Sequence, residues 1–140
     1  MGKTRLFVML AVAFLLFSAQ SLGSDWVIVA NDKNHSRGYY IDASSIRLVS
    51  GRKYSYWVKE VIAEPSKDKS INMLSNVSEI KYNYIEDCGN SSSKLQGKTI
   101  YNDSGESYTF PTILYSSFEF EPIVPDTVGE SFYKFVCEDH

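Results

Sequence analysis

The 140-residue sequence has few of the residues that build metal centres and hydrolytic sites, with only two cysteines and two histidines. Cys88 and Cys137 are not a close-spaced pair of the kind that structural zinc sites use. His35 lies in the polar segment DKNHSRG, which we interpret as an exposed turn, and His140 is the last residue. Because hydrolysis needs a nucleophile, a base and an orienting group together, we expect no catalytic, metal-binding or cofactor-binding site. We therefore interpret the protein as a non-enzyme.

An excess of positive charge is also missing. The chain has 14 Lys and Arg against 17 Asp and Glu, a net charge of −3. If Lys3 and Arg5 are removed with a leader segment, 12 basic residues remain from these 14, and the net charge falls to −5. A nucleic-acid-binding domain carries a basic patch or stripe. The charge balance therefore argues against nucleic acid as a partner.

The only long apolar run lies at the N-terminus. Lys3 and Arg5 precede the apolar run Leu6 to Phe17, and small residues follow it. This order is typical of a secretory signal peptide, whereas a membrane-spanning helix needs about 20 apolar residues. We predict a signal peptide over residues 1–23, with cleavage before Leu22 or Ser24, and a single domain over residues 24–140.

No cysteine stands near this cleavage region, so the usual acceptor of a lipid anchor is missing. We therefore expect an exported protein of the periplasm or cell surface that is not lipid-anchored and has no membrane span after signal cleavage. An even number of cysteines in an exported chain favours a disulfide, since the compartment beyond the membrane is oxidising. We predict a bond between Cys88 and Cys137; the alternatives are two free buried thiols and a metal site.

Most of the remaining sequence has the alternation of β-strands. In YSYWVKEVI (residues 54–62) the apolar face is interrupted by Glu60, which we expect near the edge of that face. In SEIKYNYIEDC (residues 78–88) Ile80, Tyr82, Tyr84 and Cys88 share one face. Acidic residues such as Glu86 are interpreted as solvated charges.

Toward the C-terminus the pattern changes from strand to helix. GNSSSKLQGK (residues 89–98) is interpreted as a loop, residues 99–110 as a β-hairpin and ILYSSFEFEP (residues 113–122) as a strand. Thr127 and Glu130 form the capping box of a final helix. Its apolar stripe consists of Val128, Phe132, Phe135 and Val136.

These patterns predict an α+β fold. We expect a single antiparallel β-sheet of about six strands, with a C-terminal α-helix that packs on one face and is tied to the sheet by the disulfide. The apolar stripe of the helix must cover apolar sheet surface. Because Cys88 lies on the same face as the strand's tyrosines, that face is the one the helix is expected to cover.

Three segments resemble one family, the surface-adhesin protein E family of Gram-negative bacteria. They are GYYIDASSI (residues 38–46), YNYIEDCG (residues 82–89) and PDTVGESFYKFVC (residues 125–137). The resemblance covers nearly all of the predicted mature chain. It implies an antiparallel sheet with a C-terminal helix held by this disulfide. It also implies a non-catalytic surface protein that binds host vitronectin, laminin or plasminogen.

The family's host-binding segment precedes its first cysteine and is rich in arginine and lysine. The matching stretch here contains Lys67, Lys69 and Lys81, which are our candidate protein-binding residues. Protein E is also a lipoprotein, a property that this sequence does not indicate. The alternative function is therefore a periplasmic envelope-assembly factor or an enzyme inhibitor without an adhesive role.

Overall fold

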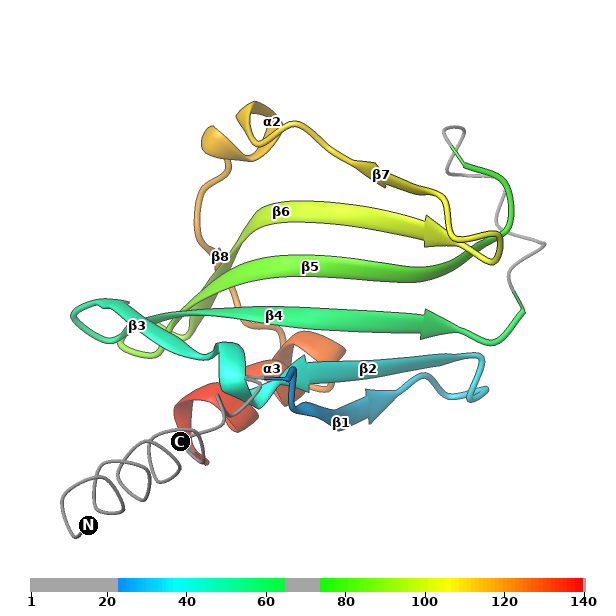
Figure 1. Ribbon diagram of the computed structural model, residues 1–140. Coiled ribbons are helices and arrows are strands. Elements are labelled where there is room, and N and C mark those ends of the chain that lie inside the picture. Colours follow the sequence, from blue (N-terminus) through cyan, green and yellow to red (C-terminus); the bar gives the residue numbers. More distant parts are fainter. Residues whose placement is uncertain (1–22, 65–73, 140) are drawn as a thin grey trace, which may run out of the picture.

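The structure, a computed structural model, describes residues 23–64 and 74–139. Figure 1 shows a long curved sheet with the last helix against it. The strands are β1 (Trp26–Asn31), β2 (Arg37–Asp42), β3 (Arg47–Ser50), β4 (Lys53–Ile62), β5 (Val77–Asp87), β6 (Ser92–Asn102), β7 (Ser107–Thr109) and β8 (Glu121–Pro122). The helical segments are η1 (Ala43–Ser45), α2 (Ile113–Ser116) and α3 (Val128–Cys137).

All strand pairs of the described sheet are antiparallel, in the order β1-β2-β4-β5-β6-β7. The predicted fold class is confirmed: one antiparallel sheet, a C-terminal helix and a disulfide between them. The described sheet has eight strands rather than about six, since β3 and β8 are short strands that pair with the first residues of β4 and β6. The predicted signal peptide lies almost wholly in residues 1–22, outside the described residues, and stays a prediction.

The Thr127 half of the predicted capping box forms at the start of α3, while Glu130 bonds to the residue before the N-cap. The Thr127 side chain accepts a hydrogen bond from the Glu130 amide at 3.4 Å. The Glu130 carboxylate in turn accepts one from the Asp126 amide at 2.9 Å. These bonds satisfy amides that the first helical turn leaves unpaired. Phe132 and Val136 then face the sheet and are buried, as the apolar stripe predicts.

Replacement of the α3 cap is expected to destabilise the domain. Thr127→Ala removes the hydroxyl that caps the helix, and such a change costs about 1 kcal/mol. Thr112→Ala is the matched control, because Thr112 precedes α2 without a side-chain capping bond. Urea titration of both variants measures the difference; equal unfolding midpoints would contradict the capping account.

The core lies between α3 and the sheet, with a second cluster farther along β5 and β6. The main cluster joins Ile41 of β2, Tyr56 and Val58 of β4, and Phe132 and Val136 of α3. Around Phe132 the rings of Tyr39, Tyr56 and Tyr84 have centroids 6.1–6.5 Å away. The second cluster contains Val77, Ile80 and Ile100. Aromatic rings therefore supply much of the packing around Phe132.

Two sequence interpretations of acidic residues are wrong. Glu60 is 3% exposed and Glu86 is 0% exposed, so neither is a solvated or edge charge. Each accepts a hydrogen bond from a tyrosine on the neighbouring strand, Glu60 from Tyr82 at 2.7 Å and Glu86 from Tyr56 at 2.6 Å. The partners lie more than 20 positions away in sequence, which is why local pattern did not reveal them.

The connection between β7 and α3 also differs from the prediction. Residues 113–122 form the short helix α2, a segment without regular structure and the two-residue strand β8, instead of one strand. Tyr115 is buried and its ring contacts Phe118 at 5.4 Å between centroids. This spacing of three residues suits a helical turn. The predicted loop over residues 89–98 is also wrong, since β6 begins at Ser92.

Candidate functional site

The two faces of the sheet differ in what they present. Even-numbered residues of β4 and β5 point to the face that carries α3, where Tyr56 and Val58 are buried. Odd-numbered residues point to the opposite face, which we call the open face. There Lys59 of β4 lies directly opposite Lys81 of β5 in the strand register. Like charges placed opposite one another destabilise a sheet unless other groups offset the repulsion.

Aromatic rings surround both lysines. The Lys59 ammonium lies 4.6 Å from the centroid of the Trp26 ring and 5.2 Å from that of Tyr40. The Lys81 ammonium lies 4.9 Å from the Tyr101 ring and 5.9 Å from the Trp26 ring. Cation–π attraction operates within about 6 Å of a ring centroid. We call these five residues the lysine–aromatic stripe.

The stripe combines charge with amphipathic rings. Its five side chains come from five strands, β1, β2, β4, β5 and β6. Each is half-buried, so part of every ring or alkyl chain remains on the surface. Tyr and Trp are enriched where proteins meet other proteins, although lysine is not. The arrangement therefore suits contact with a protein surface.

Of the three lysines predicted to bind a protein partner, the structure describes Lys81. Lys81 lies on the open face, 32% exposed, with its ammonium 3.5 Å from the Glu79 carboxylate. Lys67 and Lys69 lie outside the described residues. The structure brings Lys81 together with Lys59, a cation that the sequence analysis did not select. Alternation in β4 could have assigned Lys59 to the outer face, but its pairing with Lys81 needs the strand register.

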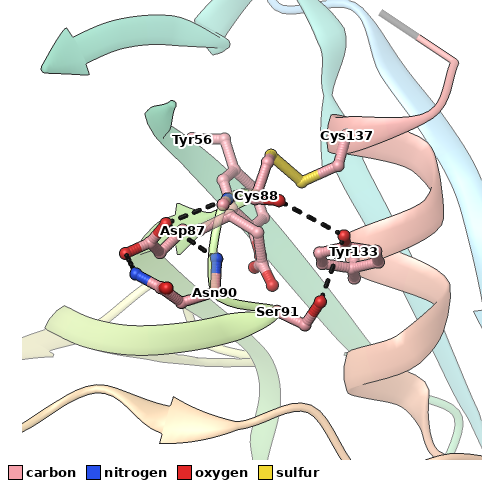
Figure 2. Close-up of a disulfide and its surroundings, with 9 residues drawn as sticks. Tyr56, Asp87, Cys88, Asn90, Ser91, Tyr133 and Cys137 are labelled. Atoms are coloured by element: carbon pink, nitrogen blue, oxygen red, sulfur yellow. Dashed lines mark hydrogen bonds between the residues drawn. A yellow bond between two sulfur atoms is a disulfide. The ribbon is translucent and has the colours of Figure 1, made fainter. Parts of the chain in front are cut away.

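The two cysteines meet at the end of the sheet that α3 approaches. Cys88 and Cys137 are bonded, with 5.6 Å between their Cα atoms. Figure 2 shows Tyr133 of α3 beside this bond. Its hydroxyl accepts a hydrogen bond from Ser91 at 3.3 Å and donates to the Cys88 carbonyl at 3.5 Å. The bond and the tyrosine together fix α3 to the β5–β6 turn.

The turn itself is organised by Asp87. Its carboxylate accepts hydrogen bonds from the Gly89 amide at 3.0 Å and from the Asn90 amide and side chain (Figure 2). The Asn90 side chain is the main reason that the pKa of Asp87 lies below its ordinary value. Asp87 therefore supports architecture. It is a further acidic residue that is buried rather than solvated, at 5% exposure.

Two further properties concern the described part of the chain. None of the helices formed by residues 23–64 and 74–139 has the length and apolar character of a membrane-spanning helix. His35, the histidine of the predicted turn, is exposed there and adopts a positive φ of 53°. The other histidine, His140, lies outside the described residues.

The fold is similar to that of solved bacterial proteins. Crystal form II of Haemophilus influenzae protein E shares 14% sequence identity and a TM-score of 0.56, covering 85% of this chain and 94% of that one. A further structure of Haemophilus influenzae protein E shares 15% identity and a TM-score of 0.53, covering 84% and 89%. At this identity the likeness shows the fold. No curated protein matches the sequence.

The sequence also matches a protein family. The family described as "Surface-adhesin protein E" matches residues 26–138, from the start of β1 to the residue after α3. This span includes the three segments that carry the resemblance and both cysteines. The chain belongs to the surface-adhesin protein E family.

Proposed function

We propose that this protein is an exported, non-catalytic protein-binding domain that acts as a surface adhesin. Membership of the surface-adhesin protein E family supports the adhesive role. The single structural observation that carries the proposal is the lysine–aromatic stripe on the open face. By the family's precedent, the partner is a host serum or matrix protein such as vitronectin, laminin or plasminogen.

The stripe suits reversible protein contact for two reasons. Trp and Tyr present large, rigid contact area with a polar edge, which suits a surface that is wet in the free state. The lysines that lie over these rings are fixed in position before binding, so less side-chain entropy is lost than for freely mobile lysines. Exposed charges chiefly steer the encounter. Binding is therefore expected to weaken as salt is raised.

The candidate residues from the sequence enter the proposal in two groups. Lys81 belongs to the stripe, together with Lys59. Lys67 and Lys69 lie in the connection between β4 and β5. We propose that they contribute to the same contact as additional cations. The mature domain spans residues 24–140 in this proposal.

Removal of the two stripe lysines is expected to weaken binding to immobilised vitronectin or laminin. For Lys59→Ala with Lys81→Ala we expect a loss of roughly 1–2 kcal/mol, about 5- to 30-fold in Kd, since each cation–π-supported charge contributes about 0.5–1 kcal/mol. The exported protein and the variant are titrated by surface plasmon resonance at low and moderate salt.

The matched control is Lys33→Ala with Lys134→Ala. It removes the same total charge from an exposed turn residue and from the exposed side of α3. An equal loss of affinity in both variants would show that the effect comes from net charge and not from the stripe. A third variant, Lys67→Ala with Lys69→Ala, measures the contribution of the β4–β5 connection. No saturable binding to vitronectin, laminin or plasminogen at either salt would favour the periplasmic factor or inhibitor.

A further inference from the structure

A cavity lies between α3 and the sheet, on the face opposite the lysine–aromatic stripe. Its volume is about 400 Å³, and its wall is made by β2, β4, β5 and α3 with one residue of β6. The lining is dominated by tyrosine rings and by Phe132 of α3. Two carboxylates, Glu60 and Glu86, line the cavity as well. Buried carboxylates need partners, because an unpaired charge in an apolar surrounding is strongly unfavourable.

The carboxylate of Glu60 has partners for both of its oxygens. Its Oε1 accepts a hydrogen bond from Arg37 at 2.6 Å, in a salt bridge. Its Oε2 accepts one from the Tyr82 hydroxyl at 2.7 Å. The negative charge of Glu60 is therefore compensated inside the protein.

The carboxylate of Glu86 has a hydrogen-bond partner for one of its two oxygens among the described residues. Its Oε2 accepts a hydrogen bond from the Tyr56 hydroxyl at 2.6 Å. Its Oε1 is buried and has no hydrogen-bond partner among the described residues. The residue is 0% exposed and is therefore shielded from bulk solvent. An unpartnered buried oxygen in a cavity wall calls for an explanation, and a bound hydrogen-bond donor would supply one.

The chemistry of the cavity wall defines which group could pair with Oε1 of Glu86. It must donate hydrogen bonds, since a carboxylate oxygen accepts them. Positive charge suits the site, because the faces of Tyr56, Tyr84 and Phe132 attract cations. A negatively charged ligand would be repelled by the ionised carboxylate of Glu86. An alkyl chain behind the charged head suits the tyrosine rings and Phe132 that line the rest of the cavity.

We propose that this cavity binds a linear alkylammonium group, with the ammonium donating to Oε1 of Glu86 and the alkyl chain lying along the tyrosine rings and Phe132. The group has two sources, a free alkylamine or the side chain of a lysine in a peptide. The site is on the other side of the sheet from the lysine–aromatic stripe, so it stands or falls independently of the proposed adhesive function.

The proton balance of binding follows from Glu86. Burial is the largest cause that raises the pKa of its carboxyl group to about 7, and the hydrogen bond from Tyr56 opposes this rise. Below that pH the free protein holds a proton on Glu86. When the ammonium ion binds, this proton leaves to solvent and the carboxylate pairs with the ammonium. Binding at pH 6 therefore releases nearly one proton per site.

The hydroxyl groups of Tyr56 and Tyr84 keep their protons over the pH range of binding. The hydroxyl pKa of Tyr56 is raised well above its ordinary value by burial and by Glu86, and burial also raises that of Tyr84 to about 12. The cavity residues of α3 carry no ionisable side chain. The remaining ionisable groups that face Glu86 from neighbouring elements are Tyr54 of β4, Glu121 of β8, Tyr82 of β5, Tyr39 of β2 and the pair of Arg37 and Glu60.

The test is calorimetric titration of the exported protein with n-butylammonium chloride, with n-butanol as the uncharged probe of the same chain length. We expect butylammonium to bind about tenfold more tightly at pH 8 than at pH 6, since the ionised fraction of Glu86 rises by that factor. At pH 6 the measured binding enthalpy is expected to differ between two buffers of different ionisation enthalpy, because the buffer takes up the released proton. N-acetyl-lysine amide replaces butylammonium in a second arm, and tighter binding of one probe identifies the source.

Two variants make the result specific. Glu86→Gln is expected to lose at least tenfold in affinity, while Glu79→Gln makes the same chemical change on the open face of the same strand and is expected to bind like wild type. Near-UV circular dichroism checks the fold of each variant. A carbon-13 NMR titration of the Glu86 carboxyl in wild type, with and without butylammonium, gives an independent measurement. Equal binding of butanol, no proton release, or unchanged affinity in Glu86→Gln would each overturn the proposal.

Discussion

Cys88→Ser combined with Cys137→Ser is expected to lower the free energy of unfolding by about 4 kcal/mol, from the loop-closure entropy of a bond that spans 49 positions. Small domains have about 5–15 kcal/mol in total, so the melting temperature should fall sharply. The serine hydroxyls retain nearly the size of the thiols. The loss therefore reports the covalent tie.

The destabilisation should appear first in α3. Beyond the disulfide, its C-terminal half contacts the rest of the domain through the packing of Val136 and Phe135 and through the long hydrogen bonds of Tyr133 with Ser91 and Cys88. Hydrogen exchange should therefore show protection lost in residues 128–137 before the β4 and β5 amides. Reduced wild-type protein is the control and should melt like the double variant. Melting of the double variant at the wild-type temperature would contradict this role.

Glu86→Gln is expected to remove a large part of the pH dependence of stability. Burial holds the pKa of Glu86 at about 7 in the folded protein, against an ordinary value of 4.5. Between these values the unfolded chain releases its proton while the folded chain keeps it. The contribution of Glu86 is therefore fully present below pH 4.5 and is lost as the pH rises through 7.

The expected difference follows from the size of that shift. At about 1.4 kcal/mol per pKa unit, the free energy of unfolding of wild type should fall by roughly 2.5 kcal/mol more than that of Glu86→Gln between pH 5 and pH 8. Gln resembles the protonated carboxyl in size, so the two proteins should be similar at pH 5. Urea titrations across this range measure the effect, with Glu79→Gln as the control. Parallel pH profiles of wild type and Glu86→Gln would contradict the raised pKa.

Groups with lowered pKa values act in a different pH window. Asp32, Asp42, Asp87 and Glu130 have lowered pKa values; a side-chain hydrogen bond is the largest cause for three of them, while for Asp42 such bonds outweigh the opposing effect of burial. A group whose pKa is lower in the folded protein than in the unfolded chain stabilises the fold at pH values above its unfolded-state pKa. That stabilisation is lost as the pH falls through the folded-state pKa. These residues therefore affect stability below about pH 4, where they do not overlap with the titration of Glu86.

The sequence by itself was sufficient for the elements whose signals are local. Alternation in residues 54–62 and 78–88 predicted the two central strands and the face that lies under α3. The Thr127 and Glu130 pair predicted the helix start, and helical spacing predicted its buried stripe. The Cys88–Cys137 bond was predicted from the even count in an exported chain. Each of these signals depends on neighbours within a few positions or on composition.

The tertiary structure decided what depends on distant neighbours. Residues 92–98 are poor in strand-forming residues, yet they pair with β5 because the backbone of β5 offers a complete row of partners. Glu60 and Glu86 are buried because tyrosines one strand away donate to them. The lysine–aromatic stripe exists because the strand register brings together residues far apart in sequence, such as Lys59 and Lys81, and the cavity because α3 packs over the sheet. A charged residue in a strand looks alike in sequence whether solvent or a tyrosine satisfies it, and only the folded neighbourhood determines which.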